Sequence, residues 1–425
     1  MGFRSKETNT AIYVDIIHLH GLSSEQEGRC FALRQEAGRC WTDMVKAHVA
    51  SRDNKKWLSC GEIEKTFKGK YALHSTCIQG LAQKLNANIA TARHLRSQQR
   101  AANQEVTTKF PYRGKAFQTV IWKESAIYWQ DDGQLRLSNQ RGKAPLVLSV
   151  PVKYQNLNIC KAELTWRADH YELCLTIDTG VAVLTSTNDG RFAGVDLGEI
   201  HIAAVATEDG DTLLVNGRAL RSVKQLRNKC HADYNALLSR CKKGSKRYRK
   251  LLKSKTRASA KCYRQQRDIL HKASRQVITF CTEHKISTLA VGDVRDIHDG
   301  VNLGHKTNQK ISQWAHGRFK GYLTSKGAVL GLETIEILED YSSRTCSNCK
   351  TVKNNAPKGR VYTCTCCGAI IHRDLNGACN ICSRAKYGLY GEIQVHTKKY
   401  LRPLRRSRAC DTGHKLLAHA RTPQL

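Results

Sequence analysis

Two close cysteine pairs near the end of the sequence are followed by an aspartate. Cys346 and Cys349 form one CxxC pair, Cys364 and Cys367 form a second, and Asp374 comes seven residues after the last cysteine. Two such pairs around a short loop can supply four thiolates to one tetrahedral zinc ion. A carboxylate suits Mg²⁺ or Mn²⁺ instead. The spacing therefore predicts a structural zinc next to a second, reactive metal.

Other candidate ligands in this region are weaker. Cys366 competes for the second pair, but the matched CxxC spacing leaves it spare. Cys379 and Cys382 form a further CxxC inside a predicted helix, and no companion pair accompanies them, so we interpret them as small helix residues. We interpret His372 as a polar residue beside the site.

The charge balance favours a polyanionic partner. The 425 residues include 70 Lys and Arg against 36 Asp and Glu, a net charge of +34, and 40% are hydrophobic, enough for real cores. No apolar run is long enough to span a membrane, and the first residues lack the apolar core of a signal peptide. The 18 cysteines mostly stand singly, as reduced buried cysteines do. We expect an intracellular protein that binds nucleic acid.

Hydrophobic periodicity divides the chain into segments. An apolar strand at 12–17 lies in an N-terminal segment, 1–22, and residues 23–105 have helical spacing. The period changes to two over 106–190, which predicts a small β-barrel or curled sheet. Three strands follow from Phe192, and then a helical hairpin at 218–283 that is interrupted near Gly244.

The hairpin is strongly basic, with nineteen Lys or Arg against two Asp between 221 and 275. Such runs are usually solvated helix faces, but here the one-sided charge would repel itself unless phosphate neutralised it. After the hairpin we predict a strand at 287–293, a helix from about 308 to 326, a strand at 334–339 and a last helix that starts near Asp374.

This order of elements is that of an RNase H-like α/β domain. Asp196 lies on its first strand, Asp293 at the end of its fourth and Asp374 at the start of its last helix. In this topology the first and fourth strands are neighbours and the last helix packs beside them, so the three acids converge. Paired Mg²⁺ ions held by such carboxylates hydrolyse phosphodiesters. Singly, each Asp has an ordinary explanation, such as a turn hydrogen bond or, for Asp374, a helix N-cap.

Several motifs together resemble the TnpB family, the RNA-guided nucleases encoded by insertion sequences and related to type V CRISPR effectors. The similarity is specific over about 190–385 and looser upstream, where 109–113 and 118–123 are similar to the wedge β-barrel of the family. The motifs are Gly194-Val-Asp196-Leu-Gly198, Val291-Gly-Asp293-Val, Tyr341-Ser-Ser-Arg-Thr-Cys346-Ser-Asn-Cys349, Tyr362-Thr-Cys364-Thr-Cys-Cys367-Gly368 and His372-Arg-Asp374-Leu-Asn376-Gly-Ala.

The resemblance implies a multidomain α+β architecture. Its parts would be a helical recognition lobe (23–105), a wedge β-barrel (106–190) with its first strand in 1–22, a RuvC-like nuclease (191–345, completed by 368–390), an inserted zinc finger (346–367) and a basic tail (391–425). Aromatic residues of the barrel, Phe110, Tyr112 and Trp122, could stack on unpaired bases. For Trp122 we favour a place in the core.

The resemblance also implies a function. A guide RNA would pair with double-stranded target DNA beside a short flanking motif, and Asp196, Asp293 and Asp374 would hold catalytic Mg²⁺, or Mn²⁺, for hydrolysis. Cys346, Cys349, Cys364 and Cys367 would hold a structural zinc. We expect a transposon-associated protein of the prokaryotic cytoplasm, at the nucleoid, acting as a monomer rather than a dimer.

One departure from the family pattern concerns the second acid, which is usually a Glu where this chain has Gly292-Asp293. Asp293 can serve, although its side chain is one methylene shorter. Glu339, at the end of the adjacent strand, can instead reach across. Otherwise cleavage is lost and the protein is an RNA-guided DNA-binding repressor, or a guide-independent zinc-containing nucleic-acid-binding protein. We expect an active nuclease, because an acid stands near the expected position.

Overall fold

The computed structural model describes residues 10–155, 157–182, 190–294, 304–355, 357 and 359–403. The chain divides into two compact units, 1–182 and 183–425, which we describe separately. The first residues of the predicted N-terminal segment and residues 404–425 of the predicted basic tail lie outside the described residues. In the parts of the chain that are described, no helix is both long enough and apolar enough to cross a membrane.

Three helices of the first unit cover the predicted helical segment. They are α1 (Ser24–Asp53), α2 (Cys60–Phe67) and α3 (Ser75–Ala101). α1 and α2 each begin with a capping box, in which Ser23 pairs with Gln26 and Ser59 with Glu62. The apolar residues predicted at helical spacing, from Cys30 to Trp41, are buried in the core of the unit.

The strands of the first unit form two antiparallel sheets. One sheet has the order β1-β7-β6-β2 and the other β3-β4-β5, and among the described residues these pairings do not close into a barrel. The strands are β1 (Thr10–Leu19), β2 (Val120–Lys123), β3 (Ile127–Trp129), β4 (Leu135–Leu137), β5 (Leu146–Leu148), β6 (Asn158–Arg167) and β7 (His170–Ala182). Trp122 is fully buried, so its interpretation as a core residue is confirmed, whereas half of Tyr112 is exposed.

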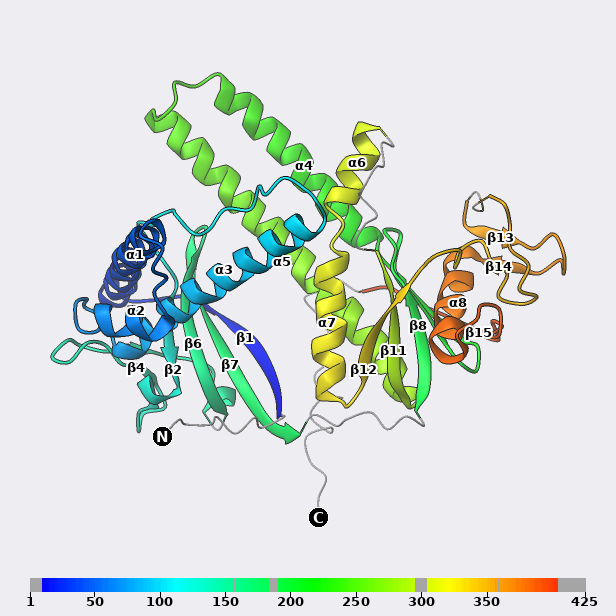
Figure 1. The fold of residues 1–425 in the computed structure, drawn as a ribbon, viewed down its shortest axis with the longest axis horizontal. Coiled ribbons are helices and arrows are strands. Elements are labelled where there is room, and N and C mark those ends of the chain that lie inside the picture. Colours follow the sequence, from blue (N-terminus) through cyan, green and yellow to red (C-terminus); the bar gives the residue numbers. More distant parts are fainter. Residues whose placement is uncertain are drawn as a thin grey trace, which may run out of the picture. The chain divides into compact units, whose positions relative to one another are not determined.

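The second unit is built on a six-stranded sheet with the order β12-β11-β8-β9-β10-β15 (Figure 1). Its strands are β8 (Arg191–Asp196), β9 (His201–Thr207), β10 (Asp211–Asn216), β11 (Ile286–Asp293), β12 (Glu333–Leu338) and β15 (Thr397–Leu401). β8 pairs in parallel with β11, so the predicted adjacency of the first and fourth strands is present. β15 pairs in parallel with β10, which places 397–401 in the sheet and not in the predicted basic tail.

Helices pack on both faces of this sheet. α5 and α7 share one apolar core with it, while α8 packs on the opposite face through Leu375, Ala378, Cys379 and Cys382 (Figure 1). Cys379 and Cys382 are therefore core residues, as predicted. The helices are α4 (Arg218–Ser239), α5 (Lys246–Glu283), α6 (His305–Ser312), α7 (His316–Val329) and α8 (Arg373–Tyr387). The single helix predicted from about 308 to 326 is thus two helices, α6 and α7.

The hairpin at 218–283 consists of α4 and α5, which separate near Gly244 as predicted. Gly244 has a φ of 83°, a conformation that glycine adopts without the penalty of a side chain. Ser245 then caps α5 through the backbone N–H of Tyr248. In the figure the hairpin extends away from the sheet (Figure 1).

Candidate metal-dependent active site

Three carboxylates from separate parts of the second unit line one pocket of about 530 Å³. Asp196 is the last residue of β8, Asp374 lies in the first turn of α8, and Glu339 follows the end of β12. The structure therefore brings Asp196 and Asp374 to one site, as the topology predicted. The N-cap of α8 is His372, so Asp374 does not have the capping role considered as its alternative.

Asp293 is not among the residues that line this pocket, whereas Glu339 is. The two acids are neighbours, because the last residue of β11 pairs with the last residue of β12 just before Glu339. A Cβ atom added at Gly292 would collide with the Glu339 carboxylate. The absence of a side chain at Gly292 thus leaves the space into which Glu339 extends. Glu339 occupies the position beside Asp196 at which Asp293 was predicted.

The carboxylates of the pocket repel one another. Burial, with the nearby charges of Glu339 and Asp374, raises the pKa of Asp196 well above its usual value. Burial and the charge of Asp293 raise the pKa of Glu339 to about 7. Glu339 Oε1 is buried and has no hydrogen-bond partner among the described residues. A divalent cation would bind both groups, the unpaired oxygen of Glu339 and the buried carboxylate of Asp196 beside it.

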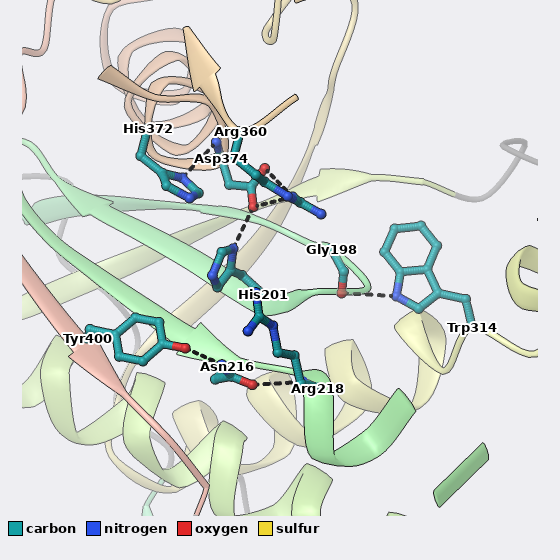
Figure 2. Close-up of polar contacts among 9 residues, drawn as sticks. All are labelled: Gly198, His201, Asn216, Arg218, Trp314, Arg360, His372, Asp374 and Tyr400. Atoms are coloured by element: carbon teal, nitrogen blue, oxygen red, sulfur yellow. Dashed lines mark hydrogen bonds and ion pairs between the residues drawn. The ribbon is translucent and has the colours of Figure 1, made fainter. Parts of the chain in front are cut away.

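Asp374 is held by two basic side chains (Figure 2). His201 Nδ1 lies 2.8 Å from Asp374 Oδ2, and Arg360 Nη1 donates to both carboxylate oxygens at 3.0 and 3.2 Å. Burial alone would raise the pKa of Asp374, but the His201 hydrogen bond and the Arg360 charge outweigh it and lower that pKa. The Asp374 carboxylate is therefore ionised and oriented.

His372 and Tyr400 complete the surroundings of His201. The His372 ring meets the His201 ring edge-on at 4.9 Å, and its Nδ1 accepts the backbone N–H of Asp374 at 3.3 Å. Tyr400, on β15, hydrogen-bonds Asn216 next to the same histidine (Figure 2). His372 is thus a polar residue beside the site, as predicted, although it also forms a possible ligand group with His201 and Asp374.

Two glycines let α8 approach the end of β8. A Cβ at Gly377 would lie 2.7 Å from Asp196 Oδ2, and a Cβ at Gly194 would collide with the backbone of α8 at Ala378 and Cys382. Any larger side chain at either position would separate the strand from the helix. Their small size therefore brings Asp196 and Asp374 into one pocket.

The four predicted cysteines converge in a second site. The Sγ atoms of Cys346, Cys349, Cys364 and Cys367 all lie within 4.8 Å of one another. Cys346 and Cys367 are 3.8 Å apart, close to the roughly 3.8 Å between thiolates of a tetrahedral zinc site. Cys366 is exposed and outside this group, as predicted. The strands β13 (Val361–Thr363) and β14 (Ile370–His372) frame the second pair.

Two buried asparagines join the cysteine site to the helix that carries Asp374. Asn376 accepts the backbone N–H of Ser347 at 2.9 Å and donates to the carbonyl of Thr345 at 2.8 Å. Asn380 donates to the carbonyls of Ser342 and Thr345, both at 2.7 Å. Both side chains are fully buried, so these bonds fix the loop of Cys346 to α8.

His201, Arg360 and the two asparagines were not among the residues predicted for the site. His201 did carry a signal, because it is the one ionisable residue in an otherwise apolar strand. The asparagines carried another, since they are four residues apart on the apolar face of a helix. Arg360 carried none that distinguishes it from the other basic residues of the chain.

Two protein-family models match parts of this chain. Residues 172–298 match the family described as OrfB_IS605, probable transposase, and residues 316–381 match the Cas12f1-like TNB domain. The first match contains Asp196 and the basic hairpin, and the second contains Glu339, the four cysteines and Asp374.

Relatives of similar sequence include the TnpB-like protein L79 of Acanthamoeba polyphaga mimivirus, which is 28% identical over 32% of this chain and 26% of its own. A putative RNA-guided DNA endonuclease of Streptomyces pristinaespiralis is 26% identical over 64% of both chains. The matches thus cover about a quarter of the mimivirus protein and just under two thirds of the Streptomyces protein.

The fold is shared with a solved Cas12f1 structure, determined as a complex with sgRNA and target DNA. The TM-score is 0.57 at 15% identity, and the alignment covers 84% of this chain and 83% of the other. Together, the two family matches and the TnpB-like relatives show that this chain is similar to the TnpB family, and the solved structure shows that it shares the Cas12f1 fold.

Proposed function

We propose that this protein is an RNA-guided DNA endonuclease whose metal-dependent, RuvC-like site consists of Asp196, Glu339 and Asp374. The observation that carries the proposal is the convergence of these three carboxylates on one pocket, with one oxygen of Glu339 buried and unpaired among the residues that the structure describes. Glu339 replaces Asp293 as the second carboxylate, because it occupies the space above Gly292. Asp293 remains close enough to act on Glu339 electrostatically.

The three carboxylates would hold Mg²⁺, or Mn²⁺. When bound, such ions would supply activation of a water for attack on a phosphodiester and stabilisation of the leaving oxygen. His201 keeps the Asp374 carboxylate in position through its Nδ1 contact. Arg360 pairs with Asp374 and also lines the pocket, where its guanidinium would be able to bind a substrate phosphate.

The four cysteines would hold zinc as a structural ion, because thiolates at tetrahedral separations suit it and buried asparagines connect their loop to α8. We assign the described part of 1–182 to the recognition lobe and wedge, and 190–403 to the nuclease with its inserted finger. The protein would act in the prokaryotic cytoplasm as a monomer.

Guide RNA and target DNA would be bound partly by the basic hairpin. Most lysines and arginines around its tip are exposed, and in α4 and α5 they greatly outnumber acids. The sequence-independent attraction of such a surface for phosphate fits a protein that holds an RNA–DNA duplex by its backbone. The solved Cas12f1 complex of the same fold contains both nucleic acids.

The proposal is tested by purifying the full chain from cells that carry its native flanking DNA and sequencing the RNA that co-purifies. The complex is then assayed for Mg²⁺-dependent cutting of a duplex matching that RNA. We expect wild type to cut and Asp196→Asn to bind the same duplex without cutting. Binding without cutting by wild type would favour the repressor-like alternative, and absence of RNA would favour a guide-independent protein.

A further inference from the structure

Three side chains of the first unit, those of His18, His170 and Glu172, converge where the end of β1 pairs with the start of β7. His18 pairs directly with Glu172 across the two strands, and His170 lies two residues before Glu172 on β7. Facing residues of antiparallel strands, and residues two apart on one strand, share a face of the sheet. This cluster is separate from the carboxylate pocket and from the cysteines, both of which belong to the second unit.

The distances between the three donor atoms are those of metal ligands. His18 Nδ1 lies 2.9 Å from His170 Nε2, and each nitrogen lies 3.5 Å from Glu172 Oε1. Ligands of a tetrahedral zinc ion at about 2.0–2.1 Å are roughly 3.3 Å apart. The three atoms therefore already form a triangle of nearly the size that one such ion requires.

A neighbouring carboxylate favours one tautomer of His170. His170 Nδ1 lies 2.9 Å from Asp169 Oδ1, which favours the proton on Nδ1. The lone pair of Nε2 then points toward His18 and Glu172. A carboxylate that holds the far nitrogen of a histidine in this way is the usual outer partner of a metal-bound imidazole. Asp169 reaches this place through a tight turn in which Ala168 has a φ of 61°.

Glu172 is buried and also has the orientation of a ligand. It is 4% exposed, and Arg167 Nε donates to its Oε2 at 3.3 Å. Oε1 is the oxygen that faces the two histidines. On the solvent side the exposed ring of His20 lies 6.0 Å from the ring of His18 and 6.1 Å from that of His170.

We propose that His18, His170 and Glu172 form a second metal site, which binds one Zn²⁺ ion and leaves its fourth position to water on the side of His20. Two imidazoles and one carboxylate are a common zinc ligand set and suit it better than Mg²⁺. The ion would join the N-terminal strand β1 to the β6–β7 hairpin.

Metal content of the full-length protein tests this site. After equilibration with Zn²⁺ and removal of free metal, we expect the His18→Ala/His170→Ala variant to retain one zinc ion fewer per chain than wild type. His94→Ala, which removes an exposed histidine from α3, is the matched control and should retain the wild-type amount. Equal zinc content in wild type and the double variant would overturn the proposal.

Cobalt substitution separates this site from the cysteines by ligand type. Thiolate ligands give intense sulfur-to-cobalt charge-transfer absorption, whereas a His₂Glu site gives only weaker ligand-field bands. The double variant should lose only the part of the ligand-field absorption that the His₂Glu site contributes, and should keep the charge-transfer bands at full intensity. Asp169→Ala, which removes no ligand, should weaken metal binding by about 10–100-fold. Spectra identical to wild type in both variants would contradict the assignment.

Discussion

The carboxylate of Glu339 occupies the space that a side chain at position 292 would need. The two residues lie on neighbouring parallel strands, Gly292 near the end of β11 and Glu339 just after β12. The position of the Glu339 carboxylate therefore depends on the absence of a side chain at Gly292. In the proposed site the second carboxylate therefore follows the end of β12 instead of ending β11, while the first and third remain Asp196 and Asp374.

Adding a side chain at position 292 should impair the carboxylate site without removing any acid. In Gly292→Ala the new Cβ would displace the Glu339 carboxylate, and a misplacement of about 1 Å can cost roughly 10²-fold in rate. We expect cutting of the guide-matched duplex to slow by about that factor, with duplex binding unchanged. Gly321→Ala, which adds a methyl group to open space on α7, is the control. Equal cutting rates for both variants would contradict the role of Gly292.

The cysteine site and Asp374 should be mechanically linked through Asn376. Asn376→Ala leaves the buried N–H of Ser347 without its partner, at a cost of about 1–3 kcal/mol. We expect a lower melting temperature and slower cutting, while the cysteines still retain zinc. Asn354→Ala, at an exposed position of the inserted finger, should change neither the melting temperature nor the cutting rate. A variant that melts and cuts like wild type would show that α8 is positioned without this bond.

Binding of the catalytic cation should depend on pH near neutrality. The pKa of Glu339 is raised to about 7, so this carboxyl must lose a proton to bind an ion. Apparent affinity for Mn²⁺ should therefore rise between about pH 6 and pH 8, by up to about tenfold per unit for each proton displaced. Without the ion, the same raised pKa makes folding stability fall as pH rises through 7. Calorimetric titration with Mn²⁺ at several pH values checks the predicted affinity, and a pH-independent affinity would contradict it.

Removing charge from the tip of the basic hairpin should weaken nucleic-acid binding in a salt-dependent way. Lys243, Lys246 and Lys250 are exposed. For each phosphate that the protein no longer neutralises, the slope of log affinity against log salt becomes shallower by about 0.7–0.9. We expect the triple Lys→Gln variant to show a smaller slope, whereas the triple Lys→Arg variant keeps the wild-type slope. Equal slopes in the Gln variant and wild type would place the hairpin outside the interface.

Much of this architecture could be predicted from local patterns. The hairpin follows from its apolar spacing and from Gly244, and the strands β8, β9 and β11 follow from short apolar runs. β15 could not be found in this way, because Thr397–Leu401 contains two exposed lysines and its pairing with β10 is long-range. The division of the 308–326 helix depends on tertiary packing around Trp314.

The candidate site was predicted in part. Asp196, Asp374 and the cysteines are marked by their position in strong local patterns. The choice between Asp293 and Glu339 depends on which side chain points into the pocket at the ends of two strands, and periodicity does not determine that direction. The roles of His201 and Arg360 depend on contacts between residues more than ten positions apart in sequence.

Cleavage by Glu339→Gln and Asp293→Asn, measured side by side on the duplex matched to the co-purified RNA, tests the central claim most directly. Glu333→Gln, at an exposed position of β12, is the control for loss of an acid. We predict that Glu339→Gln abolishes cutting while retaining binding, and that Asp293→Asn and Glu333→Gln still cut. Loss of cutting in Asp293→Asn with full activity in Glu339→Gln would contradict this account of the site.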